Sequence, residues 1–451
     1  MLSPHKQEPL PLWNPAADCL EPSTVNPITN KSNDLDPADR PFHQWYRFIL
    51  SFPPHLVRDY LYDFKVRENA KILDPFCGTG TTLIEAKRQQ MQALGIEANP
   101  FPHFASTVKV DWAIAPEELW ALTEEVVDRS YQTLAQQGID DYALTGELPK
   151  NLRSLPPQAE KALITHSISP LPLHKTVILL EHLNKLRAAP AYKYGLLAIG
   201  NALVTKIGNL KFGPEVGVGK LKGDVPVVAI WKHEMQKIIA DLQTVQGQHY
   251  PQATIYLGDA RNAAQLLPPQ SIDAVITSPP YPNEKDYTRT TRLESVLLGF
   301  VADMAELRQH KKRLLRSNTR GVYVVDDDDQ WVVGNHAVQS VANAIEQRRI
   351  HLGKTSGFER LYARVTRLYF GGMARHLATL TTVLKPGAHL AYVVGDQASY
   401  LQVLIRTGQL LAEIASELGY EVERIDLFRT RFSTGTQAEL REEVIVLRWP
   451  G

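Results

Sequence analysis

The feature that most constrains this chain is a strand, a glycine-containing turn, a helix and a second strand that follow one another in its N-terminal quarter. Lys71–Asp74 has the apolar character of a short strand, a helix is expected from about Thr81 to Gln90, and a second strand is expected over Ala93–Glu97. This succession is a βαβ unit, whose two strands run parallel. Because parallel sheets are covered by helices on both faces, the sequence predicts an α/β fold.

The remainder of the chain supplies further strands and long helical stretches. Strand patterns are expected at 254–257, 272–276, 388–394, 422–427 and 443–448. Helical periodicity fills about 113–249 and 288–384. The first of these stretches separates two strands by far more residues than a crossover needs. The sequence therefore predicts a doubly wound, mostly parallel sheet that carries two mostly helical insertions.

The turn after the first strand reads Asp74-Pro75-Phe76-Cys77-Gly78-Thr79-Gly80-Thr81-Thr82. Open α/β sheets bind ligands at the carboxyl ends of their strands, which is where this turn lies. Gly78 and Gly80 allow a tight turn and a close approach of the backbone to a ligand. Asp74 at the strand end suits a cationic amino group. The glycine spacing departs from G-x-G-x-x-G, which argues against a nicotinamide dinucleotide.

Acidic residues end the next two strands as well. Glu97 closes the second strand, about 20 residues after the turn, where a carboxylate can accept hydrogen bonds from two ribose hydroxyls. A solvated surface glutamate is the alternative. Asp259 and Ala260 follow the third strand, and Asp259 is a candidate acceptor for an adenine amino group. The alternative for Asp259 is a turn residue that caps the next helix.

The strand at 272–276 is followed at once by Thr277-Ser278-Pro279-Pro280-Tyr281. Neither proline has an N–H, so consecutive prolines fix the chain and leave their carbonyls exposed. The hydroxyl of Ser278 and the carbonyl of Pro279 can face one point, which suits an NH2 group with two hydrogen bonds to donate. Tyr281 offers a flat ring on which a base can stack. A simple proline turn is the alternative, and it leaves the serine and the tyrosine unexplained.

At these residues the chain resembles the DNA amino-methyltransferases, which modify N4 of cytosine or N6 of adenine. Their hallmarks are a (Ser/Asn/Asp)-Pro-Pro-(Tyr/Phe) catalytic tetrapeptide and a Phe-x-Gly-x-Gly cofactor loop, matched here by Ser278–Tyr281 and Phe76–Gly80. The segment at 42–54 resembles the family motif that helps to hold the methionine end of the cofactor. The tail at 442–447 resembles its last strand. The resemblance covers roughly 42–112 and 250–449.

The resemblance implies a Rossmann-like, class I methyltransferase fold that binds S-adenosyl-L-methionine. It implies cofactor contacts from Asp74, Phe76, Gly78, Gly80, Thr81, Glu97, Asp259 and Ala260, and catalytic roles for Ser278, Pro279, Pro280 and Tyr281. In that family a leading serine goes mostly with N4 of cytosine, so N4-cytosine methylation of a base flipped out of duplex DNA is expected. Methylation of adenine N6, methylation of guanine N2 in RNA, and a non-catalytic nucleic-acid-binding protein stay open as alternatives.

Four parts of the chain are expected from this order. Residues 1–40 are rich in Pro, Asn, Asp and Ser without periodicity, which predicts an irregular N-terminal arm. A catalytic domain is expected over 41–112 and 250–451. The helical insertion at 113–249 is the candidate target-recognition region, and 288–384 is a second helical insertion within the catalytic domain.

The formal net charge is zero, so no basic excess of the whole chain points to nucleic acid. A local basic stretch at Lys311, Lys312 and Arg313 is nevertheless expected to bind DNA phosphates. A solvated helix face is the alternative. The glycine-rich segment at 209–214 is either a base-reading loop or an ordinary connector.

Cysteine usage and hydropathy exclude several classes. Cys19 and Cys77 lie outside any metal-type or disulfide spacing, so no metal is expected. Carbon-5 methylation of cytosine is disfavoured because it needs a positioned thiolate, and neither cysteine lies in such a motif. No apolar run reaches the length of a membrane span and no signal pattern is present, which predicts a cytoplasmic protein. A companion restriction endonuclease is compatible with this class.

Overall fold

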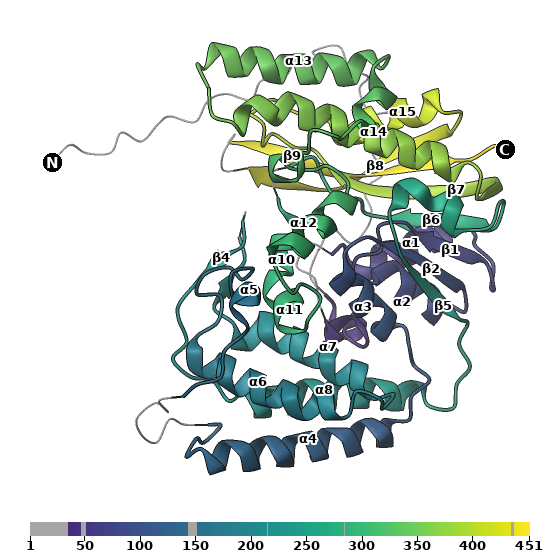
Figure 1. The fold of residues 1–451 in the computed structure, drawn as a ribbon. Helices are drawn as coiled ribbons and strands as arrows, with labels where there is room; N and C mark the ends of the chain where they lie inside the picture. The colour runs from purple at the N-terminus through teal and green to yellow at the C-terminus, as the bar shows by residue number, and fades with distance from the viewer. Residues whose placement is uncertain (1–34, 47–50, 143–150, 214, 284, 434–436) are drawn as a thin grey trace.

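The computed structural model describes residues 35–46, 51–142, 151–213, 215–283, 285–433 and 437–451 (Figure 1). A seven-stranded sheet with the order β5-β2-β1-β6-β7-β9-β8 forms its centre. The strands are β1 (Lys71–Asp74), β2 (Gln92–Glu97), β5 (Ala253–Leu257), β6 (Ile272–Thr277), β7 (Leu384–Gly395), β8 (Glu421–Ser433) and β9 (Ala438–Arg448). The pairings from β5 to β7 are parallel, and β9 runs antiparallel to both β7 and β8.

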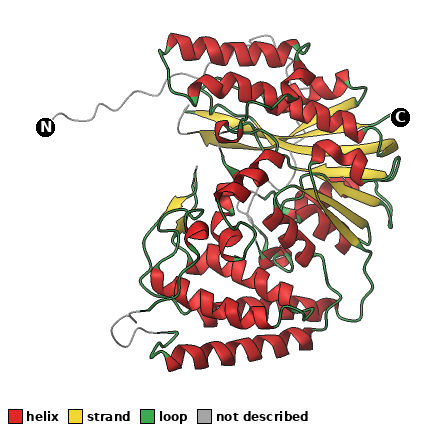
Figure 2. Cartoon of the chain, viewed as in Figure 1, coloured by secondary structure: helices red, strands yellow, loops and turns green. Residues whose placement is uncertain are grey.

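Helices cover both faces of this sheet, as Figure 2 shows. One face carries α1 (Pro54–Asp63), α2 (Thr81–Arg88) and α3 (Pro100–Lys109). The other carries α9 (Ala263–Leu266), α14 (Tyr362–Leu380) and α15 (Thr407–Glu417), with α13 (His336–His351) packed on α14. Proline opens α1 and α3, where its missing N–H and fixed φ suit the first helical turn.

The alternation of side chains along β6 produces a separate core on each face. Ala274 and Ile276 belong to the core shared with α1–α3, whereas Val275 between them belongs to the core under α14 and α15. Successive side chains of a strand point to opposite faces, so a strand buried on both sides reads as a continuous apolar run. The centre of β6 is therefore buried on both faces of the sheet.

A set of long helices follows α3 and stacks beyond the edge of the sheet (Figure 1). It comprises α4 (Pro116–Gln136), α5 (Pro157–Glu160), α6 (Pro170–Lys185), α7 (Tyr192–Ala202) and α8 (Val227–Val245). The glycine-rich segment between α7 and α8 forms a small hairpin of β3 (Leu210–Lys211) and β4 (Gly217–Val218), where the sequence suggested a loop. Two-residue strands carry too little hydrophobic alternation to be recognised.

A second set of helices lies between β6 and β7. It comprises α10 (Tyr287–Thr290), α11 (Arg292–Leu297) and α12 (Met304–Arg313), followed by α13 and α14. Figure 1 shows α10–α12 between the sheet and the long helices of the first set. Within the described residues, no helix combines the length and the apolar character that crossing a membrane would require.

The fold prediction is confirmed: the structure is a Rossmann-like α/β fold with a mostly parallel sheet and helical insertions. The last two strands are longer than expected, because β8 and β9 extend past their apolar centres as a paired hairpin. Most of the predicted arm, residues 1–34, lies outside the described residues.

Candidate active site

A cavity of about 640 Å³ opens at the carboxyl ends of β1, β2, β5 and β6. β1 and β6 are neighbours in the sheet, and the chain order runs outward in opposite directions from this pair. Such a switch point is where open α/β sheets bind ligands. Twelve of the predicted residues line the cavity: Phe76, Gly78, Thr81, Glu97, Asp259, Ala260, Ser278, Pro279, Pro280, Tyr281, Lys311 and Arg313.

The two glycines of the first turn have different surroundings. Gly78 lines the cavity with φ of +51°, and a Cβ built on it would meet no atom within 4 Å. Gly80 has φ of +86° and precedes α2, but a Cβ there would lie 3.2 Å from the Cβ of Ser106 on α3. Gly80 does not line the cavity. Gly80 serves the left-handed turn and the packing against α3, and its contact with a cofactor stays a prediction.

Asp74 also lies behind the cavity wall and does not line it. Its Oδ1 accepts hydrogen bonds from the hydroxyl of Thr277 at 2.5 Å and from the N–H of Phe76 at 3.1 Å. These bonds join the glycine turn to the last residue of β6, while direct contact of Asp74 with a cofactor stays a prediction. Its Oδ2 is buried without a hydrogen-bond partner among the described residues, and burial raises the pKa of Asp74 to about 6.

Glu97 lines the cavity with both carboxylate oxygens partly satisfied. Oε2 accepts from the N–H of Gly78 at 2.9 Å and Oε1 from the N–H of Asn99 at 2.8 Å. A carboxylate has about four acceptor positions, so further donors can be accommodated. The pKa of Glu97 is raised to about 7, chiefly by burial and also by the nearby Asp74, although these two backbone hydrogen bonds lower it.

This electrostatic arrangement fits a cationic cofactor with ribose hydroxyls. Two buried carboxyl groups at adjacent strand ends both have raised pKa values, and a nearby positive charge would favour their ionised forms. S-adenosylmethionine carries a sulfonium and an amino group. Gly78 leaves open space beside Glu97, so the residues present are compatible with this cofactor.

Asp259 makes the contacts of a capping residue. Its Oδ1 accepts from the N–H of Arg261 at 2.9 Å, and both oxygens receive the Nε of that arginine at 3.0 Å. The same guanidinium also bonds Asp328 in the segment before α13. These hydrogen bonds match the alternative prediction, in which Asp259 caps the next helix. Asp259 nevertheless also lines the cavity.

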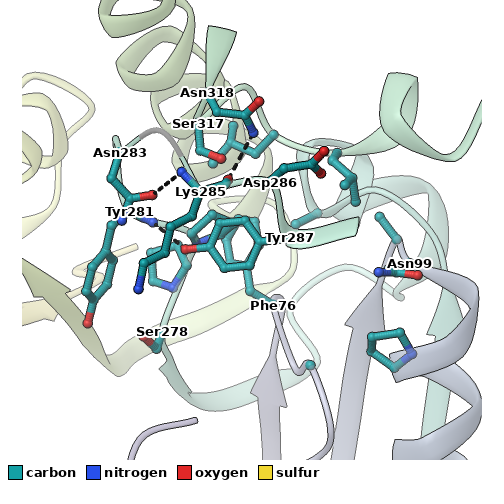
Figure 3. Close-up of a pocket in the computed structure, with 18 of the residues that line it drawn as sticks. Phe76, Asn99, Ser278, Tyr281, Asn283, Lys285, Asp286, Tyr287, Ser317 and Asn318 are labelled. Atoms are coloured by element: carbon teal, nitrogen blue, oxygen red, sulfur yellow. Dashed lines mark hydrogen bonds between the residues drawn. The ribbon is translucent and has the colours of Figure 1, made fainter. Parts of the chain in front are cut away.

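The tetrapeptide extends from β6 into the same cavity (Figure 3). The hydroxyl of Ser278 donates to the carbonyl oxygen of Val393 on β7, at 3.1 Å. Because the proton is used in this bond, the oxygen of Ser278 can act as a hydrogen-bond acceptor. The N–H of Tyr281 donates to the hydroxyl of Tyr287 at 3.2 Å, and the ring of Tyr281 packs against Gly395.

The three residues of the predicted basic stretch differ in environment. Lys311 lines the cavity, but its Nζ bonds Oδ2 of Asp286 at 2.6 Å. The charge of Lys311 is therefore paired within the protein. The sequence had suggested a contact with a DNA phosphate and did not indicate this ion pair. Lys312 and Arg313 are exposed, Lys312 with its ammonium 5.6 Å from the ring centre of Tyr323, and Arg313 at the cavity rim.

Several lining residues were not identified from the sequence. They are Asn99, Pro102, Glu215, Asn283, Lys285, Asp286, Tyr287, Asn318, Gln397, Ser399, Arg431 and Phe432. Lys285 and Tyr287 follow the tetrapeptide closely, so their proximity in sequence is a signal that could have identified them. Asn318, Gln397 and Arg431 come from distant segments, and only the folded sheet brings them to the cavity.

Comparison with known proteins agrees with this geometry. Residues 4–103 match a family model described as DNA methylase, of the N6/N4 methyltransferase type. The solved structure of TrmN from Thermus thermophilus covers 91% of this chain and 52% of its own, at 10% identity and a TM-score of 0.31, a likeness too low to carry an argument.

Curated relatives match over most of their length. The chain is 25% identical to the type II methyltransferase M.BsoBI of Geobacillus stearothermophilus, over 88% of this chain and 82% of the relative. It is 24% identical to the type II methyltransferase M.AvaI of a Nostoc species, over 91% and 87% respectively. The DNA methylase match and these similarities both support the DNA amino-methyltransferase family that the sequence motifs resemble.

Proposed function

We propose that the chain transfers a methyl group from S-adenosylmethionine to N4 of cytosine in DNA. The family implies this methyl donor and a DNA substrate. The choice of cytosine rests on the serine at the start of the tetrapeptide. Its hydroxyl donates to Val393, which leaves its oxygen as an acceptor for an amino group in the cavity. A cytosine N4 amino group needs acceptors, because each of its two N–H groups donates.

The proposed cofactor site uses the strand ends around Gly78. Glu97 accepts hydrogen bonds from the ribose hydroxyls. Asp259, which lines the same cavity and is paired with Arg261, accepts one from the adenine amino group. Phe76 supplies an apolar surface that is supported from behind by His376, whose ring centre is 4.8 Å away. Bound there, the cofactor would supply an activated methyl group and would leave as a neutral thioether once its S–CH3 bond breaks, while the methylated nitrogen would release one proton to water.

The proposed chemistry needs no covalent intermediate. The amino lone pair of cytosine is delocalised into the ring and is a poor nucleophile. Acceptors at Ser278 Oγ and the Pro279 carbonyl favour a pyramidal nitrogen whose lone pair points at the methyl carbon. The target base must leave the duplex to reach the cavity, and the rings of Tyr281 and Tyr287 flank the space it would enter (Figure 3). Fixed orientation then supplies much of the rate.

The named relatives support a further part of the proposal. Both are type II methyltransferases, so we also propose that the chain acts in a restriction-modification system, beside an endonuclease that reads the same site. The helices α4–α8 and their β3–β4 hairpin are the proposed target-recognition region.

An assay with purified protein tests this proposal. The chain is incubated with S-adenosylmethionine and either DNA or RNA from a methylation-free host, and the digested nucleosides are analysed by mass spectrometry. N4-methylcytosine in DNA is the expected product. N6-methyladenine would contradict the choice of base, and methylated RNA beside unmodified DNA would contradict the choice of nucleic acid.

A further inference from the structure

Lys285 lines the cavity, and both its backbone N–H and its backbone carbonyl are hydrogen-bonded to asparagine side chains. Its N–H donates to Oδ1 of Asn283 at 3.1 Å, and its carbonyl accepts from Nδ2 of Asn318 at 3.0 Å. Figure 3 shows both bonds and the side chain directed toward Ser278, past the ring of Tyr287. The backbone therefore aims this lysine at Ser278, the first residue of the tetrapeptide.

The ammonium of Lys285 has no hydrogen bond or ion pair with another residue that the structure describes. Burial lowers its pKa, and Arg431 lowers it further, while Glu215 and Glu442 oppose this shift. Lys311 in the same cavity provides the contrast, because Asp286 satisfies its charge. Lys285 thus keeps three donors directed into the cavity.

The chemistry of the target base limits what these donors can meet. An exocyclic amino group is itself a donor, so it pairs with Ser278 and Pro279 and never with an ammonium. The ring atom beside the amino-bearing carbon is an acceptor: N3 in cytosine and N1 in adenine. The acceptors of the tetrapeptide therefore match the amino group of the base, and the ammonium of Lys285 matches the ring nitrogen beside it.

We infer that Lys285 is a specificity-determining residue, which recognises the flipped base through its ring nitrogen next to the amino group. The inference rests on the proposed function, since it requires a base in this cavity. It does not depend on which of the two bases is methylated. Arginine at this position keeps the donors but is larger, so partial rescue is expected from it.

Kinetics of three variants test the inference: Lys285→Met, Lys285→Arg, and Lys65→Met as a matched control. Lys65 is exposed ahead of β1, at the opposite edge of the sheet. A charged hydrogen bond to a base accounts for roughly 10- to 100-fold in rate, so Lys285→Met should lose that much kcat/KM. Lys285→Arg should recover part of it, and Lys65→Met should match the wild type. Affinity for S-adenosylmethionine and for duplex DNA should change less than twofold.

A base analogue supplies the decisive comparison. Once the wild-type product is mapped, the target is replaced by 3-deazacytosine, or by 1-deazaadenine if adenine is the methylated base. The wild type should discriminate against the analogue about 10-fold or more, and Lys285→Met should not. Equal discrimination by both proteins overturns the inference, as does unchanged kcat/KM in Lys285→Met.

Binding data identify the other ways in which the inference can be wrong. A tenfold loss of S-adenosylmethionine affinity would make Lys285 a cofactor ligand, and a reduced salt dependence of DNA binding would make it a phosphate contact. Absence of any methylated base in the wild-type reaction would instead contradict the proposed function itself.

Discussion

At the scale of single residues, the site is governed by carboxyl groups that the fold has removed from water. Glu97 has a pKa of about 7 against its ordinary 4.5, chiefly because it is buried. The folded protein therefore holds this proton to higher pH than the unfolded chain does. The contribution of Glu97 to the free energy of unfolding therefore falls as pH rises from about 4.5 to about 7. Below about pH 4.5 this contribution does not change with pH.

Cofactor binding should have the opposite pH dependence. A positive cofactor favours the ionised carboxylate, so affinity should rise as pH rises through about 7. For one linked proton the dissociation constant at pH 6 should be about tenfold higher than at pH 8, as calorimetry at the two pH values can measure.

Glu97→Gln should remove most of this dependence and leave a weaker step near pH 6 from Asp74, whose pKa is about 6. Glu117→Gln, an exposed position at the start of α4, is the matched control and should keep the full dependence. A wild-type affinity that is flat from pH 6 to pH 8 would contradict the account.

The positions of candidate site residues were predictable from the sequence where a strand fixes them. Glu97 and Ser278 end strands with clear apolar patterns, so their convergence on one edge follows from the parallel sheet. Arg261 was not predictable. Its guanidinium bridges Asp259 and Asp328, which only the packing of the second insertion brings together.

At the scale of elements, the first turn depends on two glycines for different reasons. Gly80→Val places a branched residue at φ of +86° and against Ser106, so the free energy of unfolding should fall by about 2 kcal/mol or more. Cofactor affinity should fall at least tenfold with it, since the turn also carries the N–H that binds Glu97.

Gly78→Ala separates the two effects. Its φ of +51° costs about 1 kcal/mol in an alanine, and the added Cβ meets open space. Cofactor affinity should fall while the protein stays nearly as stable. Denaturant unfolding and calorimetry check both variants, and wild-type affinity in a folded Gly80→Val protein would show that the turn does not form the cofactor site.

The C-terminal end of α12 carries the next prediction. Lys312 and Arg313 are exposed, so neutralising both to Gln should weaken DNA binding for all sequences and flatten the slope of log K against log salt by about two units. Lys65→Gln with Arg67→Gln removes the same charge ahead of β1 and serves as the control. An unchanged slope in the α12 variant would mean that these residues are a solvated helix face.

At the scale of the whole molecule, one hydrophobic core joins the sheet to the first insertion. Residues of β1, α2 and α3 share a cluster with those of α4, α6, α7 and α8. Trp231 of α8 is fully buried in it, and its Nε1–H donates to the carbonyl of Gly195 at 2.9 Å. The insertion is therefore expected to unfold together with the sheet.

Trp231→Ala should lower the free energy of unfolding by about 3–5 kcal/mol and shift a single transition seen by both far-UV and near-UV circular dichroism. Trp120→Ala on α4, where the side chain is 47% exposed, is the control and should change little. A separate early transition, confined to part of the signal, would show that the insertion folds on its own.

The architecture was largely predictable because apolar strands and a glycine turn determine a parallel sheet. The β3–β4 hairpin and the length of β8 and β9 were not, since their residues pair through backbone hydrogen bonds with little hydrophobic alternation. The tetrapeptide identified the site, but the neighbours that shape it, such as Asn318 and Arg431, come from distant segments.

The most direct test of the central claim is the modified-base content of DNA from a methylation-free host that expresses this chain. Mass spectrometry of the digested DNA should detect N4-methylcytosine with the wild type and with Ser399→Ala, an exposed serine at the same cavity. With Ser278→Ala the product should fall on the order of 100-fold, by analogy with the loss of an oxyanion-hole donor, while affinity for S-adenosylmethionine persists. Wild-type levels of N4-methylcytosine from Ser278→Ala would contradict the account.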